Sequence, residues 1–420
     1  MDWSARALAW ARRLEAWAAA RQWRGSDPYE GLNASRLVGP LRGWPLSRRL
    51  VIQTVKRSPV DLRPILGIRP AANPAGVAWV ASAYALNGML EREQAGHRLR
   101  AALAVLEQLR CPGFSEPCWG YGFDFQSRVL FYGREEPNTV ATAFAGMALL
   151  DAYDALGEAS LLERARDVGR FFLRHVPLTA DGDGGYFGYA PGDRSPVHNS
   201  SMLVAALLAR ICGAGTGGEG FRSAAEAALA YTIARQRPDG SWPYGERPNL
   251  GWVDNFHTGY VLDALDACAT AGVAAGAARD AWDRGLRFYR RELFRRDGAP
   301  RYYSGSTYPL DAQCVAQAMQ TLSIASRHEP SCRADAWRVF EFARRRMLDR
   351  DGLPVFQRRR LYTVRIPHMR WVIAPTLLAL VRLMAAESQR PRPAESSGTA
   401  WADGTEVRPR RSLPVGDRAG

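Results

Sequence analysis

The chain has 420 residues, of which 56 are Lys or Arg and 42 are Asp or Glu, so its formal net charge is +14. Hydrophobic residues make up 47%, which excludes a disordered chain and allows one large core or two smaller ones. Of the basic residues 55 are Arg and only Lys56 is Lys, a bias typical of genome base composition. Because no basic helix or aromatic-basic motif accompanies the charge, we expect no nucleic-acid partner.

Membrane and secretion signals are not found in the sequence. No run of about 18 apolar residues is free of charge, so we expect no transmembrane segment. Arg12, Arg13 and Glu15 interrupt the first helix, which therefore lacks the apolar centre of a secretory signal. The six cysteines are scattered, with no Cys-x-x-Cys pair and no His at ligand spacing. We expect reduced thiols, a cytoplasmic protein, no metal site and no cofactor.

Two kinds of helix alternate along the chain. Apolar, weakly charged helices are predicted over about 74–90, 138–156, 199–213, 255–271, 311–326 and 370–387. Each of the first five is followed by a more charged amphipathic helix, over about 93–109, 158–175, 219–236, 276–296 and 330–350. Helices that are apolar nearly all round must be covered on both faces, so we interpret the first set as inner helices and the second as outer helices.

Aspartate-glycine pairs mark a repeat of about 57 residues. They begin at Asp183, Asp239, Asp297 and Asp351, and aromatic residues follow each pair. A fixed period of this size indicates a stacked or circular array of one supersecondary unit. The pairs themselves are predicted to be turns without a catalytic role. The aromatic residues after them either clamp the loops or stack on a ligand.

A closed ring needs one more outer helix, which the N-terminal helix at about 3–23 can supply. Its Trp3, Trp10 and Trp17 are spaced by sevens and form one stripe, which favours packing against the last hairpin over lying on a membrane surface. The predicted fold is an all-α (α/α)6 toroid of six helical hairpins, with long loops on one rim, over residues 1–387. Residues 388–420 are rich in Pro, Arg, Gly and Ser and are predicted to be a disordered tail.

The alternation of inner and outer helices places every aromatic loop on the same rim, at the N-termini of the inner helices. Six helix N-termini then give the enclosed space a positive potential. Long rim loops of this kind are usually functional. Asn138, Asn199, Asp254 and Asp311 stand where helix caps belong, so each has a structural explanation as well as a functional one.

The strongest catalytic candidates are Asp254 and His257, because a His three residues after an acid at a helix start faces the same side. A structural His hydrogen-bonded to its neighbour is the alternative. Asp311 on the next inner helix is the second carboxylate of a possible pair, and Tyr308 is a second proton donor. Candidate substrate-binding residues on the rim are Trp119, Tyr121, Asp124, Arg128, Asn138, Asn199, Trp242, Glu246, Asn255, Gln313, Tyr362 and Arg370. For Arg128 and Arg370, pairing with Asp124 or Asp311 is the structural alternative.

Several rim motifs resemble a family of bacterial proteins encoded with exopolysaccharide-biosynthesis enzymes. The resemblance covers about residues 24–387, is most specific around His257, and rests on the segments 27–29, 118–121, 242, 254–259, 308–311 and 369–371. It implies a six-hairpin glycosidase-like toroid, a polysaccharide context and other exopolysaccharide-biosynthesis proteins as partners. It implies no catalytic roles.

A second resemblance concerns residues 236–242, which read QRPDGSW and are similar to the Q-x-x-D-G-S-W repeat of the terpenoid cyclase and prenyltransferase toroids. Only one turn here shows the full motif. The acidic D-x-D-D proton donor of squalene-type cyclases is missing, since residues 181–185 read DGDGG. Shared turn chemistry explains the match as well as a shared reaction does.

Three functions follow as hypotheses. The first is a carbohydrate-active enzyme acting on an acidic oligosaccharide or polysaccharide. As a glycoside hydrolase it would use Asp254 with Asp311 as paired carboxylates, about 5 to 9 Å apart, with Glu246 or Asp124 as substitutes. As a uronate lyase or epimerase it would move the C5 proton with His257 or Tyr308, while Arg370 or Asn255 neutralises the carboxylate. The others are a terpenoid cyclase, which needs a dry apolar well with one strong acid, and a non-catalytic glycan-binding scaffold.

Overall fold

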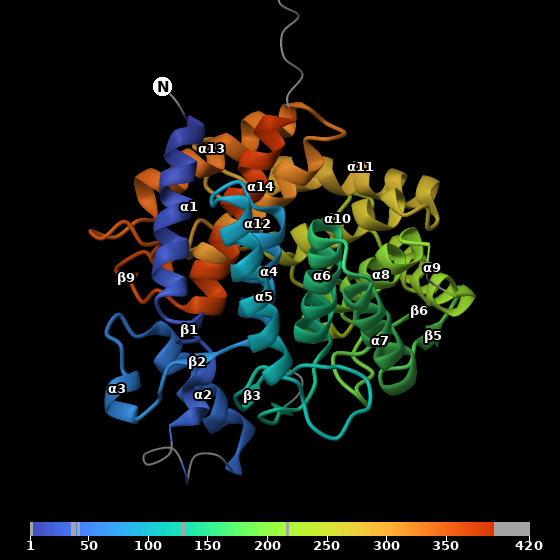
Figure 1. Ribbon diagram of the computed structural model, residues 1–420, viewed down its shortest axis with the longest axis horizontal. Helices are drawn as coiled ribbons and strands as arrows, with labels where there is room; N and C mark the ends of the chain where they lie inside the picture. Colours follow the sequence, from blue (N-terminus) through green and yellow to red (C-terminus); the bar gives the residue numbers. More distant parts are fainter. Residues whose placement is uncertain (1–2, 35–38, 40–42, 128–130, 216–217, 390–420) are drawn as a thin grey trace, which may run out of the picture. The chain divides into compact units, whose positions relative to one another are not determined.

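The computed structural model describes residues 3–34, 39, 43–127, 131–215 and 218–389. A ring of six inner helices forms the centre (Figure 1). Each inner helix packs on the next, and the last packs on the first, which closes the ring. The inner helices are α4 (Pro74–Leu86), α6 (Thr139–Leu156), α8 (His198–Gly213), α10 (Asn255–Thr270), α12 (Ala312–Ala325) and α14 (Ala374–Ser388).

Six outer helices surround this ring, so the predicted all-α toroid is confirmed. They are α1 (Trp3–Ala19), α5 (Arg92–Gln108), α7 (Ala159–His175), α9 (Glu219–Ala234), α11 (Ala275–Glu292) and α13 (Ser331–Arg346). Burial follows the predicted pattern. Every residue of α4 from Pro74 to Tyr84 is buried, whereas α11 buries only one face, which includes Trp282, Leu286 and Tyr289.

The N-terminal helix α1 completes the ring as the outer partner of α14 (Figure 1). Its Trp3 and Trp10 pack against Phe340 of α13, with ring centroids 6.4 and 5.9 Å apart. Ala7, Trp10 and Leu14 are buried in the main core. The tryptophan stripe therefore faces the protein in this structure.

One segment does not fit the expectation that the chain has no transmembrane segment. By length and composition alone, Met369–Ser388 could span a bilayer. The two arginines within it are too few to exclude such a span. The segment is the last inner helix with the turn before it, and 78% of its apolar window is buried inside the protein. The neighbouring helices therefore cover the surface that a bilayer would otherwise cover.

The loops of the rim contain strands of two or three residues and several additional helices. The described strands form four small antiparallel sheets: β1 (Arg24–Gly25) pairs with β2 (Ala71–Ala72), β3 (Phe125–Gln126) with β4 (Phe131–Tyr132), and β5 (Thr179–Asp181) with β6 (Gly184–Tyr186). The fourth sheet has three strands in the order β7 (Leu310–Asp311), β8 (Gln357–Arg358) and β9 (Thr363–Val364). The short helices are η1 (Glu30–Asn33), α2 (Pro45–Arg57), α3 (Arg63–Leu66), η3 (Pro248–Leu250) and the π-helix η4 (Met369–Ile373), which leads into α14.

The predicted aspartate-glycine turns are present with one adjustment. Gly240, Gly298 and Gly352 have φ values of +92°, +85° and +74°, a region in which glycine has no steric penalty. In the first repeat the left-handed glycine is Gly182, and Gly184 already belongs to β6. All six cysteines are unpaired, and five of them are buried. Arg128 and the predicted tail from 390 onward lie outside the described residues.

Candidate active site

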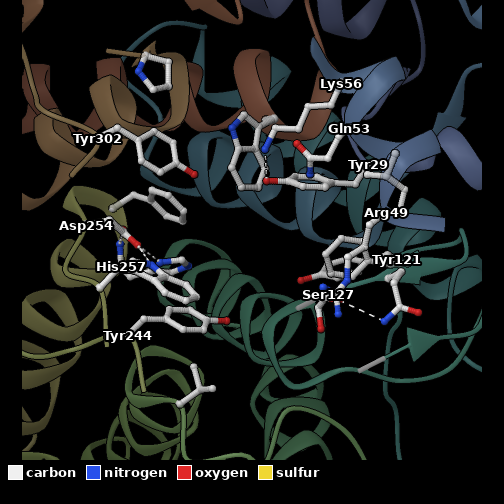
Figure 2. Close-up of a pocket in the computed structure, with 18 of the residues that line it drawn as sticks. Tyr29, Arg49, Gln53, Lys56, Tyr121, Ser127, Tyr244, Asp254, His257 and Tyr302 are labelled. Carbon is white, nitrogen blue, oxygen red and sulfur yellow. Dashed lines mark hydrogen bonds and ion pairs between the residues drawn. The ribbon is translucent and has the colours of Figure 1, made fainter. Parts of the chain in front are cut away.

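A cavity of about 520 Å³ opens at the N-terminal ends of the inner helices (Figure 2). Its wall comes from the loops that precede α6, α8, α10, α12 and α14, and from one face of α2. This is the rim on which the alternation of helices placed the aromatic loops. The site therefore gathers residues from almost the whole length of the chain.

Asp254 and His257 form a hydrogen-bonded pair at the start of α10. The Nδ1 atom of His257 lies 2.6 Å from Oδ2 of Asp254, and the backbone N–H of His257 donates to Oδ1 over 3.0 Å. The indole Nε1 of Trp252 donates to Oδ2 as well, at 2.9 Å. Asp254 is 2% exposed and caps the helix, so its position is fixed. With Nδ1 held by the carboxylate, Nε2 of His257 is the nitrogen left for a substrate.

Aromatic rings hold the imidazole in place. Tyr244 stacks on Trp252 with centroids 4.6 Å apart and an interplanar angle of 11°. The ring of Tyr244 also lies 4.6 Å from that of His257, and Phe256 lies 3.9 Å from it on another side. Such rings suit the apolar faces of a sugar. They line the cavity together with Tyr302 and Tyr303 from the loop before α12.

The cavity wall carries a strong excess of positive charge. Asp254 is the only carboxylate among the described residues that line it, against five cationic side chains: Arg49, Lys56, Arg57, Arg359 and Arg370. Since the N-termini of inner helices converge on the same space, the cavity favours an anionic ligand. A charged and open cavity is also unlike the dry apolar well that a terpenoid cyclase needs.

Arg370 is anchored by Asp27, and not by Asp124 or Asp311, which were the partners that the sequence suggested. Its Nε and Nη2 atoms donate to the two carboxyl oxygens of Asp27, over 2.5 and 2.9 Å. Both side chains are nearly inaccessible, and Arg63 donates to the backbone oxygen of Asp27. Burial alone would lower the pKa of Arg370, but Asp27 outweighs it and raises that pKa. The guanidinium thus stays charged at the cavity wall.

Helix α2 supplies residues that the sequence analysis missed. Arg49, Ile52, Gln53 and Lys56 are spaced as one face of a helix, and all four line the cavity. The Nζ atom of Lys56 donates to the Tyr29 hydroxyl over 2.6 Å. A proline at the start of 45–57, followed by apolar residues at helical spacing, is the signal that could have found this helix.

Four of the predicted site residues line the cavity: Tyr121, Asp254, His257 and Arg370. Asn199 and Trp242 border a small adjoining hollow of about 10 Å³, which Asp254 and His257 share. Trp119 and Trp242 are structural residues of the core. The indole N–H of Trp119 donates to the backbone oxygen of Leu106, and that of Trp242 donates to the backbone oxygen of Thr232.

The structure does not bring Asp311 into the cavity wall. Its Oδ1 accepts hydrogen bonds from the backbone of Gln313 and the indole of Trp371, and its Oδ2 accepts one from Gln357. Burial raises the pKa of Asp311, although these donors counteract the shift. Asp311 acts here as the cap of α12. No second carboxylate among the described lining residues therefore faces Asp254.

The remaining predicted residues have other partners or lie outside the wall. Asn255 bonds to Leu293 and Tyr289, and Gln313 donates to the Tyr260 hydroxyl. Glu246 pairs with buried His198 over 2.7 Å, and this hydrogen bond lowers the pKa of Glu246. Asp124 accepts from the backbone of Arg134. Tyr308 and Tyr362 are exposed at 42% and 39% and do not line the cavity.

Three of the four predicted helix caps are confirmed. Asn138, Asp254 and Asp311 each accept a backbone N–H from the first turn of the helix that follows. For Asn199 the expectation was wrong, because α8 begins at His198 and its cap position is Val197. Asn199 is buried in the first turn of α8 instead.

No family model matches the chain, and no curated protein matches it. Solved structures do. Cellobiose 2-epimerase from Bacillus thermoamylovorans superposes with a TM-score of 0.58 at 11% identity, over 77% of this chain and 90% of that one. A family 76 α-mannanase from Bacteroides thetaiotaomicron gives 0.58 at 14%, over 77% and 88%. A family 88 glycosyl hydrolase from Bacteroides vulgatus gives 0.53 at 10%, over 74% and 91%. At such identities the likeness establishes the toroid fold, and the site must indicate the chemistry.

Proposed function

We propose that the protein is a carbohydrate-active enzyme that removes a proton from a carbon next to the carboxylate of an acidic sugar. The observation that carries this proposal is the Asp254–His257 pair at the wall of a cationic cavity. A carboxylate that accepts Nδ1–H keeps the imidazole in the tautomer with a basic Nε2, and it stabilises the imidazolium that forms. Uronate lyases and uronate epimerases both begin with such a step.

The cationic wall supplies the second requirement of this chemistry. When the C5 proton of a uronate leaves, negative charge develops on the carboxylate oxygens. Arg370, held by Asp27, is one fixed positive charge in the wall. Asp27 occupies the Nε donor and one Nη2 donor of Arg370. A sugar carboxylate would therefore bind the remaining N–H groups, on Nη1 and Nη2, and this contact would fix the sugar relative to His257.

Hydrolysis by two carboxylates has less support from this site, because Asp311 is occupied as a helix cap and does not line the cavity. The likeness to epimerase and glycosidase structures supports a sugar substrate in general. A role in exopolysaccharide biosynthesis and a cytoplasmic location, with other proteins of that pathway as partners, remain part of the proposal on the strength of the sequence.

The test incubates the protein with oligosaccharides that contain glucuronate or mannuronate, in D2O, and follows the C5 position by NMR. The wild type should either incorporate deuterium at C5, as an epimerase, or lose the C5 signal with formation of a 4,5-unsaturated sugar, as a lyase. His257→Ala should lower the exchange rate by about 10²- to 10⁴-fold, since it removes the base, and Asp254→Asn should also lower it strongly. Both variants should keep the far-ultraviolet circular dichroism of the wild type.

The matched control is His97→Ala, which removes an exposed histidine of the outer helix α5 and should leave the exchange rate unchanged. Full activity in both His257→Ala and Asp254→Asn would refute the assignment. Binding of the oligosaccharides without exchange and without any other change to the sugar, even at high protein concentration, would instead indicate a glycan-binding scaffold.

A further inference from the structure

The one lysine of the chain lies in the cavity wall. The sequence holds 55 Arg and a single Lys, at position 56, in the last turn of α2. Lys56 is 8% exposed and shares the inner face of α2 with Ile52 and Gln53. A guanidinium cannot lose its proton near neutral pH, whereas a buried amine can. Lys56 can therefore exchange a proton near neutral pH, whereas the arginines of the wall cannot.

The surroundings of Lys56 are aromatic. Its Nζ atom donates to the Tyr29 hydroxyl over 2.6 Å, and it lies 4.1 Å from the centroid of the Tyr29 ring and 5.7 Å from that of Trp371. Among the described residues, no carboxylate oxygen lies within 4.0 Å of this amine. Tyr29 and Trp371 pack edge to face, with centroids 5.1 Å apart, so the amine is held in a defined place.

This environment lowers the pKa of the Lys56 amine. Burial lowers the pKa of Lys56 to about 8, Asp311 and Asp27 counteract the shift, and Arg359 and Arg57 add to it. Burial also raises the pKa of Tyr29, so the phenol stays protonated and acts as a neutral partner. At neutral pH the amine can both give and accept a proton on the time scale of a reaction.

Lys56 and His257 approach the cavity from opposite sides. Figure 2 shows Asp254, His257 and Tyr244 on one wall, and Lys56, Gln53 and Tyr29 on the other. The histidine comes from α10 and the lysine from α2, two elements about 200 residues apart in the sequence. A sugar ring placed between the two walls would present one face to each group.

We propose that Lys56, in contact with Tyr29, is the second proton-transfer group of this cavity, acting on the face of the sugar opposite His257, so that the enzyme inverts the carbon. This inference rests on the proposed function, because it concerns the same C5 proton. It separates the two remaining reaction types: a lyase needs a base and a leaving group, whereas an epimerase needs a proton donor on the opposite face.

The proposed step balances without any further reagent. Nε2 of His257 takes the C5 proton, and the electron pair of the C–H bond moves onto the carboxylate as an enediolate. The Lys56 ammonium then donates a proton to the opposite face, the electron pair returns to form the new C–H bond, and the configuration is inverted. His257 ends protonated and Lys56 neutral, and exchange with solvent restores both. Nothing is oxidised or reduced, and no C–O bond breaks.

The experiment uses the full chain with the same glucuronate and mannuronate oligosaccharides in D2O. The wild type should incorporate deuterium at C5 and accumulate the C5 epimer. Lys56→Arg, which keeps the charge, and Lys56→Met should still exchange the C5 proton through His257. Both variants should form the epimer more slowly than the wild type by a factor of about 10² or more. Thr54→Ala, on the exposed side of the same helix, should match the wild type.

Each other outcome has a distinct meaning. Lys56 variants that form the epimer at the wild-type rate would overturn the inference, as would a wild type that converts the sugar to an unsaturated product and forms no C5 epimer. A wild type that neither exchanges the C5 proton nor forms an unsaturated sugar would instead overturn the proposed function.

A second measurement needs no variant. Because the chain has one lysine, ¹⁵N-lysine labelling gives a single side-chain signal, whose titration should have its midpoint at about 8 and move when a uronate binds. If the Lys56 variants do not fold, a midpoint at the ordinary 10.5, unmoved by uronate, would overturn the inference.

Discussion

Breaking the ion pair between Asp27 and Arg370 should be strongly destabilising, because it joins the N-terminal loop to the turn before the last inner helix and both partners are buried. The contact spans 343 positions, and the side chains are 4% and 6% exposed. Asp27→Asn keeps the shape and one acceptor oxygen but turns an amide N–H toward Nε of Arg370. A buried guanidinium is then left incompletely paired, which typically costs about 3–5 kcal/mol of the free energy of unfolding.

A matched control is the pair between Arg100 and Glu158. It also joins different elements over a long separation, at 2.7 Å, but its side chains are 57% and 42% exposed. Solvent and salt screen such a pair, so Glu158→Gln should cost less than about 1 kcal/mol. Urea titrations followed by far-ultraviolet circular dichroism measure both changes.

The double variant tests the coupling directly. Arg370→Gln combined with Asp27→Asn replaces two charges by two amides that can bond to each other. Its loss of stability should be smaller than the sum of the single losses by about 1 kcal/mol or more, since the residues are in contact. Equal costs for Asp27→Asn and Glu158→Gln, or additive losses in the double variant, would refute the reasoning.

Two further predictions concern pH and packing. Burial holds the pKa of His368 well below its ordinary 6.5, and Arg63, Arg370 and Lys56 lower it further. The unfolded chain therefore takes up a proton that the folded one does not, and the free energy of unfolding should fall as the pH drops below 6.5, by at most about 1.4 kcal/mol per pH unit. Urea titrations at about pH 7 and about pH 5.5 should show a smaller fall in His368→Gln than in the wild type, and equal falls would contradict this. In α11, a Cβ added at Gly285 would lie 2.5 Å from the ring of Trp242, whereas one at Gly276 would meet nothing within 4 Å. Gly285→Ala should therefore cost about 1–3 kcal/mol, and Gly276→Ala should be neutral or slightly stabilising, in thermal unfolding; the opposite order would show that Trp242 does not clamp this helix.

The helices were predictable because their signals are local. The inner helix at 255–270 is apolar on nearly all sides, the outer helix at 275–292 has one apolar face, and both patterns follow from burial at a period of 3.6 residues. The Asp254–His257 contact was equally predictable, since a spacing of three at a helix start brings two side chains together whatever the rest of the chain does.

Other residues of the site were not predictable, because their partners lie far away in the sequence. The partner of Arg370 is Asp27, 343 positions away, and both Asp124 and Asp311 were plausible from the sequence. Asp311 also looked like a catalytic carboxylate, and only its contacts with Gln357 and Trp371 show that it serves as a buried cap. The composition of a loop does not tell which of its polar groups turn inward.

Local patterns in the sequence are enough to predict the ring, its inner and outer helices, the rim that carries the aromatic loops and the cap that orients His257. Each of these depends on periodicity or on neighbours within a few residues. The tertiary structure alone decided what faces His257. The wall opposite comes from α2, a helix about 200 positions earlier, and no residue near Lys56 in the sequence indicates that its side chain shares a cavity with His257. Closure of the ring brings these distant surfaces together, and no local pattern encodes which side chains then share one cavity.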